Sequence, residues 1–257
     1  MDAFKSYRIF DWYYYLGYIL LGFLLKSSLN ISIIKHFLLG AFLLAYAFSF
    51  NIFCDKNEKK KFFLLPLTLS FLMLPLFNLF QTIISLIFLI IVTFYSAYPF
   101  RWKVKPFLSS LCNGFGFTII FLLGYFYIPN ITIEGLLFSI LIFCFNMVAQ
   151  FIHEIVHEKV DKKNKIITTT VFYGERTVRY FCYLFLLLSL LITFYLLYMK
   201  FINIIFFVIT TSFIIFFIIE IYRKNIDKSF REKYKILGIL IGFIYFISLI
   251  LKNLLVF

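Results

Sequence analysis

The chain has 257 residues, of which 63% are hydrophobic and 14% are charged, with a mean hydropathy of +0.98. One soluble core cannot bury this much apolar surface, so the composition excludes a soluble globular protein and predicts an all-α integral membrane protein. The formal net charge of +13 is accounted for by positive charge on one face of a membrane, and we expect no nucleic-acid partner.

Polar residues divide the chain into about nine apolar segments, each near the ~20 residues that an α-helix needs to cross a bilayer. The predicted spans are residues 10–26, 33–53, 62–79, 81–98, 107–128, 135–153, 177–199, 201–221 and 236–256. We predict a single transmembrane domain over residues 1–257, folded as one helical bundle.

The distribution of Lys and Arg predicts the orientation of these spans. With a cytoplasmic N-terminus, nearly all of the 25 basic residues fall on cytoplasmic segments, as the positive-inside rule requires. The exceptions are Lys26, Lys35, Lys200 and Lys252. We therefore expect a cytoplasmic N-terminus, with most of the charge of both signs on the cytoplasmic face.

A first group of polar residues closes the second predicted span, in the stretch AFSFNIFCDKNEKKK. Asn51, Asp55 and Glu58 stand at i, i+4 and i+7, a spacing that places them on one face of a helix. Oxygen ligands of this kind suit Mg²⁺, which in proteins often bridges carboxylates and substrate phosphates. An ordinary charged loop is the alternative explanation.

The connection between the fourth and fifth predicted spans reads YSAYPFRWKVKPF. Pro99 and Pro106 bracket Arg101, Lys103 and Lys105. Prolines shape a fixed turn, and basic side chains beside tyrosine hydroxyls can hold a phosphate through charge-assisted hydrogen bonds. The alternative is a loop that is basic only because it is cytoplasmic.

A stripe of polar residues ends the sixth predicted span, in FIHEIVHEKVD. The residues that fall within about 60° of one another on a helix are Gln150, Glu154, His157 and Asp161. Ionisable groups within a span are costly and usually face a bundle interior or a watery cavity, so the stripe predicts a functional site. A hydrated helix end is the alternative.

The same stretch contains HEIVH, which matches the HExxH signature of zinc proteases. In that interpretation His153 and His157 bind zinc and Glu154 is the general base. The third ligand would be a distant residue such as Glu220, because the remaining histidine, His36, is predicted near the opposite face. This interpretation leaves YSAYPFRWK and TTTVFYG unexplained, and we rank it last.

Together the three polar stretches resemble the UbiA family of membrane-bound prenyltransferases, whose members are multi-span helical bundles with two aspartate-rich motifs on the cytoplasmic side. The first family motif has the form NDxxDxxxD. NIFCDKNEK is similar to it in Asn51 and Asp55 but has Ile52 and Lys59 at two aspartate positions. YSAYPFRWK resembles the intervening family segment, a Tyr-Ser pair followed by a proline and a basic pair.

The second family motif reads DxxDxxxD, followed by a glycine, a threonine and a short run ending in glycine. In HEIVHEKVDKKNKIITTTVFYG, the three acidic positions hold Glu154, His157 and Asp161. After them Thr168 and Gly174 match the family, whereas a lysine stands in place of its first glycine. The stretch is thus similar to a variant of this motif.

The resemblance implies an enzyme that moves a polyprenyl group from a diphosphate donor to an aromatic or lipid acceptor, with Mg²⁺ as cofactor. The implied catalytic residues are Asp55, Glu154 and Asp161. The implied metal ligands are Asn51, Asp55, Glu58, Glu154, Glu158 and Asp161. The implied substrate-binding residues are Asn51, Tyr95, Tyr98, Arg101, Lys103, Gln150 and His157.

Three alternatives stay open. A UbiA-type terpene cyclase would end the same ionisation in ring closure, and a relative without catalysis would bind a lipid or a partner with the same scaffold. The HExxH membrane zinc protease is the third. For the main interpretation we expect a multi-pass protein of the cell membrane, surrounded by membrane lipids, with its active site on the cytoplasmic side.

Overall fold

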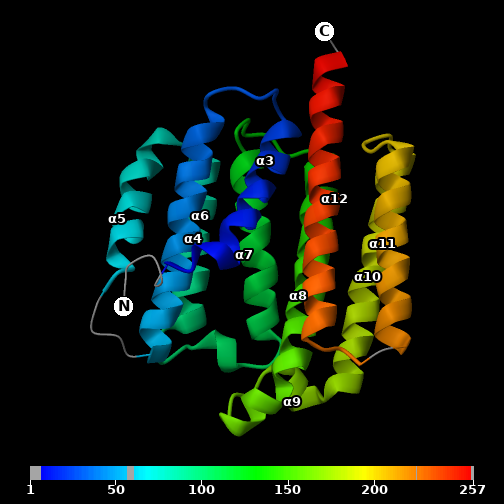
Figure 1. The fold of residues 1–257 in the computed structure, drawn as a ribbon. Coiled ribbons are helices and arrows are strands. Elements are labelled where there is room, and N and C mark those ends of the chain that lie inside the picture. The colour runs from blue at the N-terminus through cyan, green and yellow to red at the C-terminus, as the bar shows by residue number, and fades with distance from the viewer. Residues whose placement is uncertain (1–6, 57–60, 224, 256–257) are drawn as a thin grey trace. The chain divides into compact units, whose positions relative to one another are not determined.

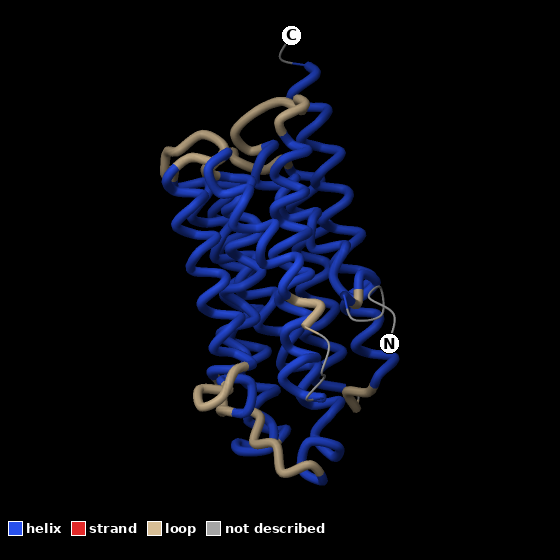
Figure 2. Tube along the Cα trace, turned by 90° about the vertical axis from the view of Figure 1, so that its left-hand side faces the viewer, coloured by secondary structure: helices blue, strands red, loops and turns tan. Residues whose placement is uncertain are grey.

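The structure is a computed structural model that describes residues 7–56, 61–223 and 225–255. Every regular element in these ranges is helical, as predicted (Figure 1 and Figure 2). The α-helices are α2 (Ile9–Trp12), α3 (Leu16–Leu24), α4 (Ile33–Lys56), α5 (Leu64–Met73), α6 (Leu79–Ser96), α7 (Leu108–Tyr125), α8 (Ile133–Lys163), α9 (Thr169–Tyr173), α10 (Glu175–Tyr198), α11 (Ile204–Arg223) and α12 (Lys228–Leu255). Short 3₁₀ turns occupy Tyr13–Tyr15, Leu74–Leu76 and Trp102–Val104.

The chain divides into two compact units. Unit 1 comprises Met1–Trp102 and Gly116–Asn130, and unit 2 comprises Lys103–Phe115 and Ile131–Val256. Helix α7 therefore contributes its first half to unit 2 and its second half to unit 1. Each unit has its own core of buried apolar side chains. That the whole chain forms one domain stays a prediction.

Among the described residues, seven helices are long and apolar enough to cross a membrane. They correspond to the second predicted segment and to the fourth through ninth. The first and third segments form the shorter apolar stretches Ile9–Leu24 and Leu64–Leu76. The third ends early because Asn78 starts a new helix, where its side chain accepts a hydrogen bond from the Gln81 N–H and completes a capping box.

Helix α8 extends beyond the apolar span predicted for residues 135–153. It continues through the polar stripe, as the helical spacing of the stripe predicts, and ends at Lys163. Lys162 and Lys163 lie in its last turn, where positive charge is favourable beside the negative end of the helix dipole. All of the polar stripe is consequently helical. The sequence pattern predicted that its residues share one face of a helix, but it did not predict their contacts.

In unit 1, two glycines bring α3 and α7 into direct backbone contact. A Cβ atom on Gly124 would overlap the carbonyl oxygen of Ile19, and one on Gly22 would overlap that of Phe121. Small residues at such crossings let transmembrane helices pack closely. By contrast, Gly17 of α3 has no atom within 4 Å of the position of an added Cβ.

We therefore expect Gly124→Ala to destabilise the protein, because overpacking of a tight contact costs about 1–3 kcal/mol. Gly17→Ala is the matched control, since alanine in an open helical position is neutral or stabilising by up to ~1 kcal/mol. The apparent Tm of each variant in detergent measures the effect. Equal Tm values for the two variants would contradict the close contact.

Within each unit, the connections predicted to be cytoplasmic lie at one end. In unit 1, Arg101 after α6 contacts Asp55 at the end of α4. In unit 2, Arg179 at the start of α10 donates to the carbonyl oxygen of Ile221 at the end of α11, and Arg231 at the start of α12 contacts His157 near the end of α8. The side of the membrane that these ends face stays a prediction.

Candidate functional site

The site residues of unit 1 centre on a contact between an acid and a base. Asp55 lies in the last turn of α4, and its Oδ1 accepts a hydrogen bond from Arg101 Nη2 at 3.4 Å. Both side chains keep access to solvent, at 41% for Asp55 and 28% for Arg101. An exposed ion pair of this length contributes little stability, so a ligand that competes for either charge disrupts little.

Tyr98 also contacts the guanidinium group of Arg101. Its hydroxyl oxygen accepts a hydrogen bond from Arg101 Nη1, and the guanidinium carbon lies 4.9 Å from the centre of its ring. The guanidinium thus has a fixed direction between Tyr98 and Asp55. Tyr95, one turn earlier, is partly buried at the end of α6.

Asn51 lies one turn before Asp55 on α4, as the spacing predicts, but its side chain forms a hydrogen bond with α6. Its Oδ1 accepts a hydrogen bond from the Ser96 hydroxyl at 3.1 Å. This contact joins the ends of the two helices that carry Asp55 and the Tyr98–Arg101 turn. Glu58, the third member of the predicted group, lies outside the described residues.

A polar cluster of unit 2 surrounds Glu154, which is only 1% exposed. Its Oε1 accepts hydrogen bonds from the hydroxyls of Ser109 at 2.9 Å and Ser110 at 2.8 Å. Its Oε2 accepts from the backbone N–H groups of Thr169 at 2.8 Å and Thr170 at 3.4 Å. A fully buried carboxylate with this many donors is satisfied by the protein itself.

The two backbone contacts of Glu154 have a clear structural reason. Thr169 and Thr170 are the first residues of α9, and the first N–H groups of a helix have no partner within the helix. A carboxylate satisfies them and interacts favourably with the positive end of the helix dipole. The Thr169 hydroxyl in turn accepts from the N–H of Phe107, which ties α9 to the segment before α7.

Both histidines of HEIVH contact Arg231 from α12. Arg231 Nη1 donates to Nδ1 of His153 at 2.9 Å and to Nε2 of His157 at 3.2 Å. Because guanidinium has no acceptor, each of these ring nitrogens uses its lone pair on Arg231 rather than on a metal. Glu154 meanwhile binds the start of α7 and α9. The geometry therefore differs from a zinc protease site, in which the glutamate faces the metal-bound water.

The remaining predicted residues of α8 have different surroundings. Gln150 donates to Glu154 Oε1 at 3.3 Å, so it belongs to the buried cluster. Asp161 is partly exposed and lies within electrostatic range of His157 and Glu154. Glu158 forms an ion pair with Lys162 at 2.6 Å, one turn further along the helix. Asp161 is thus the accessible carboxylate of the stripe, and it forms no ion pair within the part of the chain that the structure describes.

The polar partners of the stripe were missed by the sequence analysis. They are Ser109, Ser110, Thr169, Thr170 and Arg231. In the sequence, TTT is similar to part of a family motif and Arg231 adds to the predicted cytoplasmic positive charge, and neither pattern indicates a contact with α8. Lys103, which was predicted to bind phosphate, opens unit 2 and lies in the 3₁₀ turn Trp102–Val104.

Several solved structures have the same fold as this chain. A UbiA homolog from Archaeoglobus fulgidus bound to GPP and Mg²⁺ is 19% identical, with 97% of this chain and 99% of that chain covered and a TM-score of 0.75. The Cd²⁺-bound form of a UbiA homolog from the same organism is 20% identical, with 96% and 98% covered and a TM-score of 0.77.

A third structure concerns digeranylgeranylglyceryl phosphate synthase in membranes, and it is 19% identical over 97% of this chain and 99% of that chain, with a TM-score of 0.78. No curated protein matches the chain. The model of the UbiA prenyltransferase family matches residues 56–250, which is well over half of the sequence. This chain therefore belongs to the UbiA prenyltransferase family.

Proposed function

We propose that this protein is a membrane prenyltransferase that moves a polyprenyl group from a diphosphate donor to an aromatic or lipid acceptor. The observation that carries the proposal is the contact between Asp55 and Arg101 in a chain of the UbiA family. An acid that can hold a cation and a base that can hold a phosphate lie side by side there. GPP and DMAPP, each with Mg²⁺, are bound in structures of the Archaeoglobus fulgidus homolog, which has the same fold.

The described carboxylates fit a Mg²⁺ ion that shares its ligands with a diphosphate. Proteins usually hold Mg²⁺ through one or two carboxylates together with substrate phosphates and water, without an all-protein cage. Among the described residues, no group of three or more His, Cys, Asp or Glu side chains is arranged to hold a metal, which agrees with this kind of site. We propose Asp55 as a carboxylate ligand of unit 1 and, separately, Asp161 as a carboxylate ligand of unit 2.

In the proposed reaction, the bond between the allylic carbon and the diphosphate oxygen breaks, and the diphosphate leaves with the electron pair. Bound Mg²⁺ supplies positive charge that stabilises this leaving group. Arg101, oriented by Tyr98, and Lys103 donate charge-assisted hydrogen bonds to its oxygens. The acceptor then forms a bond to the allylic cation and loses a proton.

Glu154 has a different role in this proposal from the one that the motif alignment implied. Because its carboxylate is buried and satisfied by five donors, we propose that it positions α9 and the start of α7 rather than binding metal. Gln150 supports the same cluster. His157 and Arg231 form a separate contact between α8 and α12, and we place them near the substrate without a direct catalytic role.

The proposal is tested by measuring diphosphate release by the purified protein in detergent. We expect a panel of prenyl diphosphates to release diphosphate only with Mg²⁺, and product masses to show prenylated acceptor when an aromatic or lipid acceptor is supplied. We also propose that the reaction occurs on the cytoplasmic face of the cell membrane, where the ends that carry Asp55 and Asp161 would lie.

Product masses separate the alternatives. A hydrocarbon product formed without acceptor would show a terpene cyclase, and binding of prenyl diphosphate without release would show a relative that has lost catalysis. Absence of any diphosphate chemistry, with one tightly bound zinc ion lost on His153→Ala, would overturn the proposal in favour of the protease.

A further inference from the structure

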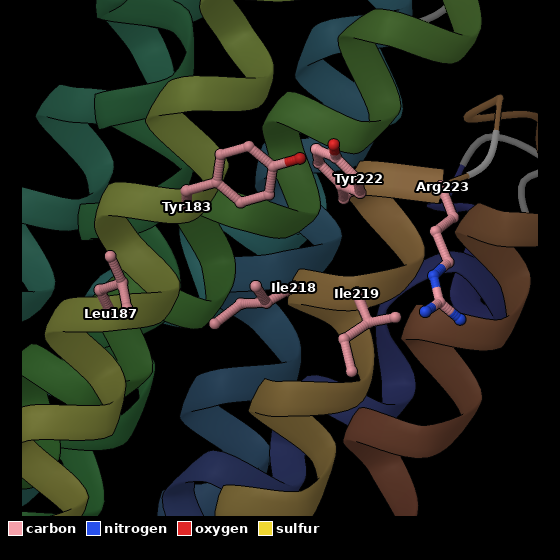
Figure 3. Close-up of a pocket in the computed structure, with 6 residues that line it drawn as sticks. All are labelled: Tyr183, Leu187, Ile218, Ile219, Tyr222 and Arg223. Atoms are coloured by element: carbon pink, nitrogen blue, oxygen red, sulfur yellow. The ribbon is translucent and has the colours of Figure 1, made fainter.

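Helices α10 and α11 of unit 2 form the walls of an open groove of about 510 Å³ that none of the site residues lines. Its lining residues are Tyr183, Leu187, Ile218, Ile219, Tyr222 and Arg223 (Figure 3). The volume lies in the range of ~300–1,000 Å³ that is typical of small-molecule sites. Leu187 and Ile219 are exposed on the outside of the helix pair, so the groove opens away from the core of the unit.

The groove is apolar along most of its length and lies on two helices that are long enough to span a membrane. In a bilayer such a surface meets hydrocarbon rather than water. A shallow apolar recess between two spans therefore fits a hydrocarbon chain. A free, water-soluble anion would find no partner along the walls formed by Leu187, Ile218 and Ile219.

One end of the groove is polar. Arg223 is the last residue of α11, and Tyr222 precedes it. Figure 3 shows the Arg223 side chain running back along the helix beside Ile219, and the Tyr183 hydroxyl directed toward Tyr222. A basic residue and tyrosines at the end of a span are typical of the level of the lipid headgroups.

The charge of Arg223 has no acidic partner among the described residues, which sets it apart from Arg179 on the neighbouring helix. Arg179 pairs with Glu175 and donates to the carbonyl oxygen of Ile221. An arginine at the headgroup level without such a partner attracts anionic lipid. A second copy of the chain docked through the same groove would instead bring two Arg223 side chains into one two-fold contact, where they would repel.

We propose that this groove binds an anionic glycerophospholipid of the membrane. One acyl chain lies along Leu187, Ile218 and Ile219, and the headgroup phosphate accepts hydrogen bonds from Arg223 and from the hydroxyl of Tyr222. The site is separate from the carboxylates assigned to the transfer reaction. The fraction of protein molecules with an anionic lipid in the groove therefore depends on the lipid composition of the surrounding membrane.

Photo-crosslinking in nanodiscs tests the proposal. The probes are phosphatidylglycerol and phosphatidylcholine that carry the same diazirine-labelled acyl chain, and peptides labelled by each are mapped by mass spectrometry. We expect phosphatidylglycerol to label the groove about fivefold more strongly, the factor expected for one favourable charge at the membrane surface. Arg223→Gln should remove this preference. Arg176→Gln should keep it, because Arg176 lies in the first turn of α10 and does not line the groove.

A second pair of variants tests the hydrocarbon part. Leu187→Trp should fill the groove and lower labelling by both probes, whereas Leu191→Trp, one turn further on the exposed face of α10, should not. Tyr222→Phe replaces Arg223→Gln as the test if Arg223→Gln does not fold. It removes only one hydroxyl from a side chain that is 81% exposed, so it should fold. It should weaken the preference for phosphatidylglycerol.

Three results would overturn the proposal. Equal labelling by both probes that is unchanged in Arg223→Gln would show ordinary contact with bulk lipid. Displacement of the probe by a prenyl diphosphate, with no effect of added phosphatidylglycerol, would show that the groove takes the donor tail. Cross-links between two copies through Leu187 or Ile219 would show a protein interface. None of these outcomes depends on turnover, so failure here leaves the proposed transferase activity unaffected.

Discussion

Asp161→Asn is expected to lower the rate of Mg²⁺-dependent diphosphate release by about 10²–10³-fold, the usual effect of removing one group that stabilises developing charge. The substitution keeps the shape of the side chain and removes the negative charge that we assign to metal binding. Steady-state release of diphosphate from a prenyl diphosphate, measured over a range of Mg²⁺ concentrations, gives the effect. A partial recovery at high Mg²⁺ is expected if the lost charge weakens metal binding.

Asp227→Asn is the matched control for this variant. Asp227 lies at the start of α12 in the same unit, where its Oδ1 accepts the N–H of Phe230 as a helix cap. Asparagine caps a helix about as well as aspartate, so the same change of charge should leave both folding and rate intact. Equal rates for Asp161→Asn and the wild-type protein would refute the role of Asp161 as a metal ligand.

Glu154→Ala is expected to lower the stability of the protein by about 3–5 kcal/mol, because it leaves several buried donors without an acceptor, at about 1–3 kcal/mol each. Without the carboxylate, the first N–H groups of α9 and the hydroxyls of Ser109 and Ser110 lose their acceptor. For a chain of this size we expect the apparent Tm in detergent to fall by on the order of 10 °C.

The control is Glu158→Ala, the same substitution one turn further along α8. Glu158 makes an i, i+4 ion pair with Lys162, whose side chain is 57% exposed, and such pairs contribute at most ~1 kcal/mol. Its Tm should therefore stay close to that of the wild-type protein. If Glu154→Ala kept its Tm but lost turnover, the carboxylate would act on the metal rather than on the position of α9.

The main features of the fold were predictable because the membrane constrains them strongly. A helix needs a minimum length to cross hydrocarbon, and charged residues are excluded from that length, so the apolar segments map onto helices almost one for one. The errors lie where a different rule applies. The third segment was overestimated because the capping box at Asn78 starts a new helix, and the sixth segment marks only the apolar part of a helix that continues through the polar stripe.

The candidate site was predictable only as a set of positions. The spacing of polar residues along the helical period predicted that Asn51 and Asp55 lie on one helix. It also predicted a second helix that carries Gln150, Glu154, His157 and Asp161. The structure confirms both placements, on α4 and α8. Spacing carries no information about which neighbour a side chain meets. Glu154 and Asp161 both looked like metal ligands, although one is buried in a hydrogen-bonded cluster and the other is partly exposed.

Composition and the spacing of apolar segments were enough to predict a helical membrane protein, because both are local properties of the chain, and the polar stretches added a resemblance to the UbiA family. The role of HEIVH followed only from the packing of the helices. The donors that satisfy Glu154 come from residues up to 45 positions away, and the arginine that meets His153 comes from 78 positions away. Such contacts follow from how helices pack, and packing alone separates a structural carboxylate from an accessible one.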